Sequence, residues 1–406
     1  MKRLLLAILT TTFILIGFVF YTTPETTPVS KKIEASTPAP PTPFDGVLRE
    51  YETYINEALQ RTGTPGAAVA IVMDSTIIYL KGFGVKNMET QKPVDVHTVF
   101  RLGSVSKPVA ATLVGILAEK DILDLEDTVT HFLPDFTLSL PTYSNELKLK
   151  HVLSQSTGFP YHAYTNLIEE AWTLPTMVNE LKTVQLIAKP GQVYSYQNVA
   201  YSLIDPIVAA ASGHTFEDEI RSKLFGPLFM TDASVTYEAL MKNENIAQPH
   251  LFRGKQWKPI PISETYYNAA PAGGINASIT DMAKWMTAML GYRPEVISPA
   301  TTAEFFEPQV RATAKNRNFN RWSRIRKSYY GLGWRIINFK NDTLAYHGGY
   351  VNGFRSEVAI HPTRKIAICV LANGPSSFSD LAIPSFFIIY DKYIRPPMDQ
   401  DVLAAP

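Results

Sequence analysis

The stretch RLGSVSKPVA, residues 101–110, brings two serines and a lysine together just before an apolar run. If these residues begin a helix, Ser104 and Lys107 share one face because they are three residues apart, while Ser106 points elsewhere. A serine hydroxyl beside an uncharged amine is an activated nucleophile. The helix N-terminus and the apolar residues that follow both favour the uncharged form of Lys107. Ser104 is therefore the candidate nucleophile, and Lys107 is its candidate base.

Two further motifs decide whether this pair is more than an ordinary helix start. A serine that caps a helix beside a solvent-exposed lysine produces the same Ser-x-x-Lys spacing, so the spacing alone is weak evidence. Downstream, the chain carries Tyr-Gln-Asn at 196–198 and His-Gly-Gly at 347–349. Taken singly, these residues read as a core aromatic, a turn residue and a strand histidine. Their joint order is what indicates a catalytic site.

The three motifs together resemble the serine β-lactamase and penicillin-binding protein superfamily. The branch they resemble most holds class C β-lactamases, D-alanyl-D-alanine carboxypeptidases and family VIII esterases. The segments FRLGSVSK, ILDLEDTVTHFLPDF, PAGGINASITDMAKWM, YGLGW and VLAN also look like family segments in the same order. The resemblance covers roughly residues 45–390. It implies a serine hydrolase that works through an acyl-enzyme.

The resemblance also implies catalytic roles. Ser104 is the acylated nucleophile, Lys107 and Tyr196 share proton transfer, and Asn198 orients Lys107 and the substrate amide. His347 opens the third motif and lies near the phenol. A phenol titrates near pH 10. With Lys107 and His347 beside it, the Tyr196 anion is expected to form more easily and to take the serine proton.

The third motif supplies the expected binding groups. The backbone N–H groups of Ser104 and Tyr350 are implied to form the oxyanion hole. Gly348 and Gly349 are expected to let a strand edge approach the substrate without side-chain obstruction. Arg355 is a candidate for binding a substrate carboxylate; a surface arginine is the alternative.

His-Gly-Gly departs from the Lys-Thr-Gly of class C β-lactamases, and this departure bears on the substrate. A fixed cation is replaced by a group that is mostly neutral near pH 7. Slow β-lactam turnover, hydrolysis of short esters and cleavage of D-amino-acid peptides are therefore expected. A true class C-type β-lactamase and a non-catalytic penicillin-binding or sensor protein are the alternatives.

The surrounding sequence predicts the elements that carry these motifs. Helical periodicity marks residues 44–61, two strands flank a turn at Asp74-Ser75, and a final helix covers 379–394. Strand signals at both ends enclose a long helical stretch. The predicted fold is α+β, with an antiparallel sheet flanked by helices and a mainly helical insertion. Within a hydrolase domain at 44–395, the sheet part is expected at 44–119 and 326–395, and the helical part at 120–325.

The ends of the chain read differently from its body. Residues 1–20 combine Lys2 and Arg3 with an apolar run, and residues 21–43 form a Pro- and Thr-rich linker. An uncleaved membrane anchor is favoured over a removed signal peptide, because no small-x-small cleavage site follows the run. Either reading predicts a periplasmic or other extracytoplasmic protein. Residues 396–406 are expected to be a flexible tail.

The composition of the chain limits which classes of binding partner are expected. The formal net charge is +1 and 46% of the residues are hydrophobic, so nothing favours a nucleic-acid partner. The basic stretch 311–330 is better explained as a solvated loop, or one that meets anionic lipid or cell-wall polymer. Cys369, the single cysteine, lies in an apolar strand and is expected to be a buried core residue. No metal and no cofactor is expected; the predicted partners are a small-molecule or peptide substrate, and a membrane through the N-terminal run.

Overall fold

The computed structural model describes residues 43–312, 322, 325–339 and 342–394. The predicted anchor, the linker up to residue 42, the C-terminal tail and most of the basic stretch lie outside the described residues. Within the described part of the chain, no helix has both the length and the apolar character needed to cross a bilayer.

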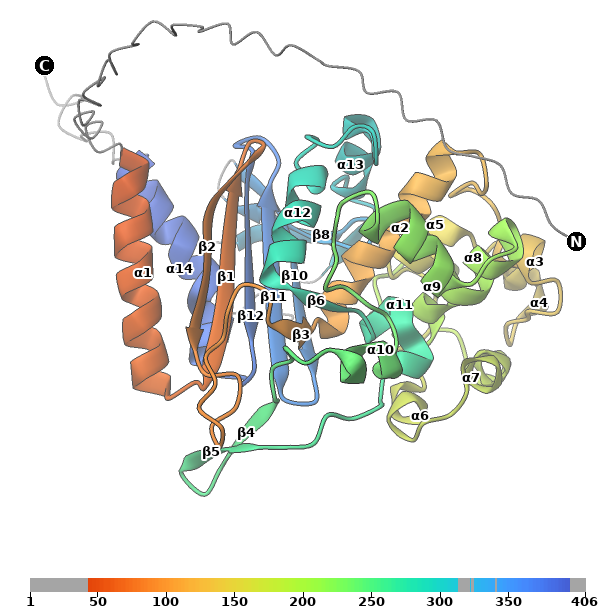
Figure 1. Cartoon of the computed structure of the whole chain (residues 1–406). Coiled ribbons are helices and arrows are strands. Elements are labelled where there is room, and N and C mark those ends of the chain that lie inside the picture. Colours follow the sequence, from red (N-terminus) through yellow and green to blue (C-terminus); the bar gives the residue numbers. More distant parts are fainter. Residues whose placement is uncertain (1–42, 313–321, 323–324, 340–341, 395–406) are drawn as a thin grey trace, which may run out of the picture. The chain divides into compact units, whose positions relative to one another are not determined.

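An antiparallel sheet of eight strands forms the centre of the described residues (Figure 1), in the order β2-β1-β12-β11-β10-β9-β8-β7. Two strands come from the N-terminal side and six from the C-terminal side, so the sheet is assembled from both ends of the chain. The strands are β1 (Gly66–Met73), β2 (Thr76–Gly84), β7 (Val310–Ala312), β8 (Ile325–Tyr330), β9 (Arg335–Phe339), β10 (Asp342–Val351), β11 (Phe354–His361) and β12 (Ile366–Ala372).

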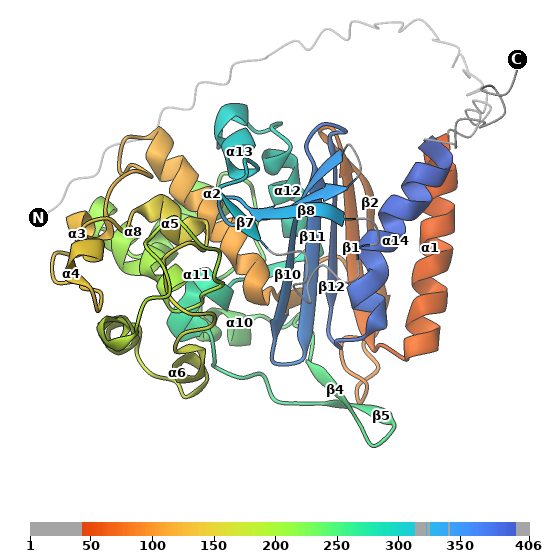
Figure 2. The same ribbon diagram turned by 180° about the vertical axis from the view of Figure 1, so that it is seen from behind.

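Helices cover both faces of this sheet, as Figure 2 shows from behind. On one face pack α1 (Pro43–Thr62) and α14 (Ser377–Ile394); on the other pack α2 (Ser106–Glu119) and α12 (Ile279–Met289). Because β12 is buried on both faces, its sequence is continuously apolar and does not alternate. Cys369 lies in this strand and is fully buried, which confirms the prediction for it.

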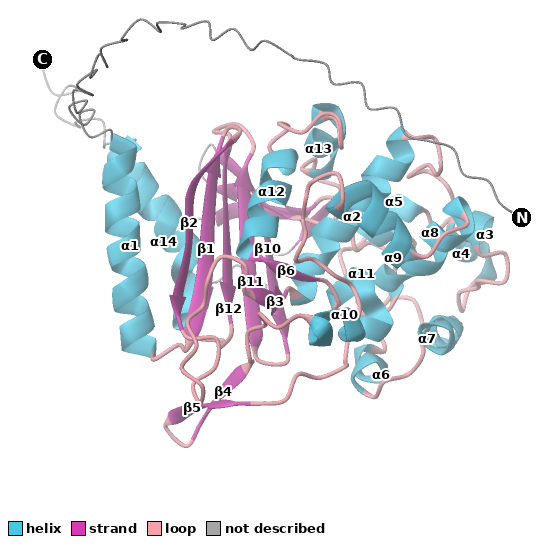
Figure 3. Cartoon of the chain, in the orientation of Figure 1, coloured by secondary structure: helices cyan, strands magenta, loops and turns pink. Residues whose placement is uncertain are grey.

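The segment between the two sheet-forming regions consists mostly of short helices and loops (Figure 3). The α-helices are α3 (Val129–Phe132), α4 (Pro141–Ser144), α5 (Leu149–Leu153), α6 (Thr165–Glu169), α7 (Leu174–Glu180), α8 (Ile204–Ser212), α9 (Phe216–Ile220), α10 (Tyr237–Lys242), α11 (Ala270–Gly273) and α13 (Pro299–Phe305). The 3₁₀ turns are η1 (Gly103–Val105), η2 (Leu181–Thr183), η3 (Ala200–Leu203) and η5 (Tyr267–Ala269), and η4 (Arg221–Phe225) is a π-helical turn. Two small two-stranded sheets pair β3 (Val99–Arg101) with β6 (Asn276–Ser278) and β4 (His250–Arg253) with β5 (Gln256–Pro259). The α+β prediction is confirmed.

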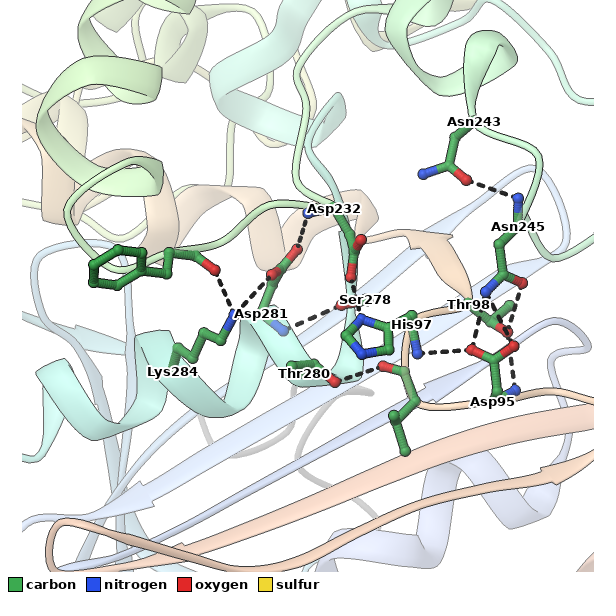
Figure 4. A network of polar contacts seen from close by, with 12 residues as sticks. Asp95, His97, Thr98, Asp232, Asn243, Asn245, Ser278, Thr280, Asp281 and Lys284 are labelled. Atoms are coloured by element: carbon green, nitrogen blue, oxygen red, sulfur yellow. Dashed lines mark hydrogen bonds and ion pairs between the residues drawn. The ribbon is translucent and has the colours of Figure 1, made fainter. Parts of the chain in front are cut away.

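A buried carboxyl group lies at the start of α12 (Figure 4). Asp281 is fully buried, and its Oδ2 accepts a hydrogen bond from the backbone N–H of Asp232 at 3.1 Å. Its Oδ1 has no hydrogen-bond partner among the described residues, and Lys284 Nζ is 4.0 Å away. Burial, and then the charge of Asp232, raise the pKa of Asp281 to about 7. The folded protein therefore holds this proton more tightly than the unfolded chain does.

This burial predicts that the contribution of Asp281 to stability falls as the solution becomes less acidic. Between about pH 4 and pH 7 the unfolded chain releases the Asp281 proton before the folded protein does, so the contribution of this group to the free energy of unfolding decreases with rising pH. Asp281→Asn keeps the shape and cannot ionise. We expect it to raise the thermal midpoint at pH 8 by at least about 2 °C, and to bring less or no gain at pH 4. A midpoint lowered equally at both pH values would contradict the prediction.

Candidate active site

The two serines of the first motif have different surroundings. Ser104 lies in η1 and is partly exposed, whereas Ser106 begins α2 and is fully buried. Ser106 Oγ accepts a hydrogen bond from the backbone N–H of Ile275 at 3.0 Å. Ser104 thus lies in a 3₁₀ turn and not inside the helix. Residues three apart in such a turn still lie on the same side, so Ser104 and Lys107 remain neighbours. Of the two hydroxyls, only that of Ser104 is open to a substrate.

The turn that carries Ser104 packs directly against strand β10. A Cβ on Gly349 would overlap the Leu102 carbonyl oxygen and would lie 2.9 Å from the Ser104 nitrogen. Gly103, with φ +50°, faces the backbone of Tyr350 just as closely. The backbones of Ser104 and Tyr350 are therefore neighbours, as an oxyanion hole requires. Gly349 is needed for this close approach of two backbone segments, rather than to leave room for substrate.

Gly348 does not share this role, and the expectation for it needs correction. Successive residues of a strand point to opposite faces. A Cβ on Gly348 would point toward the Tyr346 hydroxyl at 2.8 Å and the Glu357 carboxylate at 3.0 Å, on the face away from Ser104. Gly348 therefore cannot clear a path for substrate at Ser104.

The two glycines give a matched pair of variants. Gly349→Ala is expected to slow acylation of Ser104 by roughly 100-fold or more, since the methyl group must push the Ser104 turn away from β10. Gly348→Ala meets only the ends of two side chains and is expected to lower stability while acylation stays within a few-fold of the wild type. Acylation rates measured with a fluorophosphonate probe, beside thermal midpoints, check both. Equal rate losses for the two variants would show that the packing of Gly349 against the turn is unimportant.

Lys107 is fully buried and has no carboxylate partner among the described residues. Burial, and then the charge of Arg335, hold the pKa of its amine well below the usual value, as the sequence predicts. Its Nζ donates to Asn198 Oδ1 and to the Ala272 carbonyl oxygen, both at 2.8 Å. A neutral amine has two N–H donors and one lone pair. With both donors used, the lone pair remains to accept a proton.

Tyr196 lies with its ring centroid 4.6 Å from Lys107 Nζ. Its hydroxyl is buried beside Ser104 but forms no well-aligned hydrogen bond among the described residues. Burial raises the pKa of Tyr196 to about 12, although the charge of Arg335 and the neighbouring Ser104 oppose the rise. The expectation of an easily formed Tyr196 anion is therefore wrong, because burial outweighs the nearby charge. The phenol is a proton donor in the free enzyme.

The loop that carries Tyr196 and Asn198 is anchored by a glutamine. The carbonyl oxygen of Gln155 accepts a hydrogen bond from the N–H of Ser195 at 2.8 Å. The side chain of Gln155 donates to the carbonyl of Gln197 at 3.1 Å and accepts from its N–H at 2.5 Å. These contacts hold a buried irregular segment, whose backbone groups could not otherwise be satisfied.

His347 is fully buried, and both of its ring nitrogens have a partner. Nδ1 lies 3.1 Å from the Gly348 carbonyl oxygen, which can only accept, so Nδ1 carries the proton. Nε2 therefore accepts from the Tyr330 hydroxyl at 3.1 Å. Burial, and then the charge of Arg335, hold the pKa of His347 well below its ordinary value. A neutral imidazole whose two nitrogens are both hydrogen-bonded cannot bind a substrate carboxylate as a cation. Its ring lies beside that of Tyr196, with the two centroids 6.3 Å apart.

Arg355 is not brought to the site, which corrects its predicted role. It shares a face of β11 with Glu357, to which it is ion-paired, and its Nη2 lies 3.4 Å from Asp380 Oδ1 of α14. Ser356, between the two, points the other way and donates to the Leu102 carbonyl beside Ser104. The Arg355 guanidinium therefore lies on the opposite face of the sheet from the nucleophile.

A different arginine occupies the neighbourhood of the catalytic groups. Arg335 begins β9, directly after the YGLGW segment, and is 3% exposed. Its guanidinium carbon lies 5.2 Å from the centroid of the Tyr196 ring. Its Nε and Nη1 are buried and have no hydrogen-bond partner among the described residues. Among the described residues, no carboxylate is paired with this buried guanidinium, which lies beside the Tyr196 ring.

The comparisons with known proteins bear on the family and the fold of the chain. The profile of the Beta-lactamase family matches residues 51–385. The chain belongs to the Beta-lactamase family. It is a hydrolase of this family, related at a distance to proteins that are named as hydrolases.

The relatives of this beta-lactamase family chain are diverse. The unguisins hydrolase ungD′ of Aspergillus campestris is 25% identical over 88% of the chain and 67% of its own length. The protein flp of Staphylococcus aureus is 22% identical over 81% of the chain and 64% of its own length. The chain spans about two thirds of the length of these curated relatives. An octameric penicillin-binding protein homologue from Pyrococcus abyssi has the same fold, with a TM-score of 0.72 at 24% identity over 84% of this chain and 77% of that one.

The sequence motifs do not identify several groups around the candidate active site. Arg335 could have been suspected because it follows YGLGW directly. Nothing in the sequence indicates that Gln155 or Ala272 lies at the site. The described residues contain no group of three or more His, Cys, Asp or Glu side chains that could share a metal ion. What converges is a serine, a neutral amine, a neutral phenol and two adjacent backbone segments, a set suited to acyl transfer by acid–base chemistry.

Proposed function

We propose that this chain is a serine hydrolase that forms an acyl-enzyme on Ser104 and cleaves a substrate bearing a carboxylate close to the scissile bond. A peptide that ends in a D-amino acid is such a substrate. The buried guanidinium of Arg335 carries this choice. A buried positive charge beside Tyr196 would attract a substrate carboxylate through the low-dielectric interior. An extracytoplasmic location, which the apolar N-terminal run predicts, fits a cell-wall peptide.

In the proposed acylation step, the neutral Lys107 amine removes the proton of Ser104 as its Oγ attacks the scissile carbonyl carbon. The oxyanion that forms is stabilised by the backbone N–H groups of Ser104 and Tyr350. As the C–N bond breaks, Tyr196 gives its proton to the leaving amine and regains one from the Lys107 ammonium. The low pKa of the Lys107 amine and the high pKa of the Tyr196 phenol both support this division of labour.

In the proposed deacylation step, water attacks the Ser104 ester and gives up a proton through Tyr196 to Lys107. The tetrahedral intermediate then releases Ser104 Oγ, which regains the proton. Asn198 keeps the amine in place throughout, since its Oδ1 accepts from Nζ at 2.8 Å. The site returns to its starting state after each turnover.

The carboxylate requirement can be tested with a pair of substrates. An acyl-D-Ala-D-Ala peptide with a free carboxylate should be cleaved with about 10- to 100-fold higher kcat/KM than the same peptide as its C-terminal amide. Arg335→Gln should reduce this ratio to near one. A short p-nitrophenyl ester without a carboxylate serves as the control. Its rate of hydrolysis by the variant shows whether loss of the Arg335 charge has itself impaired Tyr196. The ratio of kcat/KM values isolates the effect of the Arg335 charge on the substrate carboxylate.

Other outcomes would favour the remaining candidates. A wild-type ratio near one, with fast hydrolysis of the ester, would indicate an esterase. Faster turnover of nitrocefin than of either peptide would indicate a true β-lactamase. Acylation by a penicillin with no turnover of the peptides or of the ester would indicate a penicillin-binding or sensor protein. The first result would overturn the proposed preference for a carboxylate; the other two would overturn the choice of a peptide, since nitrocefin and penicillins also carry a carboxylate beside the scissile bond.

A further inference from the structure

A second histidine lies beside the candidate proton-transfer groups, outside the three motifs. His162 follows α5 in an irregular loop and has φ +58°, a left-handed conformation that is uncommon for any residue but glycine. Its backbone N–H donates to the carbonyl oxygen of Tyr196 at 2.9 Å. Such strained backbone often marks functional sites. The loop of His162 is thereby tied directly to the loop of the phenol.

The imidazole of His162 is connected to Lys107 by a chain of side-chain contacts. Its Nδ1 lies 3.2 Å from Thr165 Oγ1 at the start of α6. Asn198 Nδ2 donates to the same Thr165 oxygen at 3.3 Å, while Asn198 Oδ1 accepts from Lys107 Nζ at 2.8 Å. Both ends of the Asn198 amide are therefore held, the oxygen by the lysine and the nitrogen by the threonine and, at 3.5 Å, by the Tyr266 hydroxyl.

The donors and acceptors in this chain assign its protons. Asn198 Nδ2 can only donate, so Thr165 Oγ1 accepts from it, and the Thr165 hydroxyl proton is then available to Nδ1 of His162. In the arrangement that uses this proton, the imidazole is neutral and carries its own proton on Nε2. Burial, assisted by the charge of Arg335, lowers the pKa of His162 to about 4, in agreement with a neutral ring at pH 7.

The ring of His162 is also fixed by aromatic neighbours. Its centroid lies 4.2 Å from that of Tyr161, nearly perpendicular, and 5.5 Å from that of Tyr196. The imidazole is thus held between an exposed tyrosine and the buried phenol. It cannot easily rotate away from Thr165.

We propose that His162 is a positioning residue: its Nδ1 accepts the Thr165 proton and so fixes the Asn198 amide with its oxygen on the Lys107 amine. This inference rests on the proposed function, since it assigns Lys107 as the base for Ser104. Without the acceptor, the Thr165 hydroxyl is free to turn, the Asn198 amide loses a fixed partner, and Lys107 spends less time in the productive geometry.

The test uses two variants that both tolerate the left-handed backbone. His162→Gly removes the acceptor, whereas His162→Asn offers Oδ1 in nearly the place of Nδ1. The readout is the rate constant for labelling of Ser104 by a fluorophosphonate reporter, which depends on the nucleophile but not on the natural substrate. We expect His162→Gly to be about 10- to 100-fold slower than the wild type, and His162→Asn to stay within about threefold of it. Thermal midpoints of both variants report any loss of folding.

A double variant separates positioning from a merely structural role. Thr165→Val removes the same hydrogen bond from the other side, so His162→Gly combined with Thr165→Val should be no slower than the worse single variant. The proposal would be overturned if the rate loss of the double variant equalled the product of the two single losses. It would also be overturned by a labelling rate for His162→Asn as low as that for His162→Gly. Absence of labelling in the wild type would instead refute the proposed function itself, so the two failures can be told apart.

Discussion

Replacing Ser104 with alanine is expected to abolish covalent labelling and to lower turnover by at least about 10⁴-fold, because no other hydroxyl can replace the nucleophile. Ser104 is the partly exposed serine beside the Tyr196 hydroxyl and the β10 backbone. Intact-mass analysis after reaction with a fluorophosphonate or a penicillin measures the adduct, and peptide mapping locates it. An adduct on any other residue would refute the assignment.

Ser106→Ala is the matched control for this experiment. Its hydroxyl is buried and accepts from the Ile275 N–H, so its removal leaves a buried donor unpaired. We expect a loss of about 1–3 kcal/mol in the free energy of unfolding, with labelling at Ser104 retained. If Ser106→Ala abolished labelling while the protein stayed folded, Ser106 and not Ser104 would be the nucleophile.

Changes in Lys107 and Tyr196 are expected to have the next largest effects. Lys107→Met preserves the buried volume and removes the base, and Tyr196→Phe removes the proton donor. Each should lower kcat by about two to four decades, as the loss of general acid–base catalysis does. Rates with a D-amino-acid peptide, and circular dichroism to verify folding, provide the measurement.

The two side chains should behave as one unit. Lys107 Nζ lies 4.6 Å from the Tyr196 ring, and both groups act on the same proton in the proposed mechanism. The combined variant should therefore be only slightly slower than the worse single variant. Losses that multiply would mean that the amine and the phenol serve separate steps.

The pH dependence of this reaction follows from the pKa of Lys107. Burial and the charge of Arg335 lower that pKa, so the amine is in its reactive neutral form at a lower pH than an exposed lysine would be. The rate should fall as acid protonates the amine. Arg335→Gln removes a nearby positive charge and should move this acid limb to higher pH.

Much of the fold could be predicted because the signals for it are local. Apolar runs broken at Asp74-Ser75 indicate two strands, and the structure has β1 and β2 there. The three-residue spacing of Ser104 and Lys107 survives even though the serine lies in a 3₁₀ turn and not in the helix. Residue order and short-range spacing determine these features, so they can be predicted from a single sequence.

The sequence by itself determined the family, the α+β class and the candidate pair of Ser104 and Lys107, since these follow from motif order and periodicity. Only the tertiary structure decided which arginine lies beside the candidate catalytic groups. Arg355 follows the third motif closely, yet the pleat of β11 turns it to the far face, where Glu357 and Asp380 bind it. Arg335 reaches Tyr196 from another strand. The protonation of Tyr196 is also set by burial among distant segments, and burial is a property of the packed chain that no local pattern encodes.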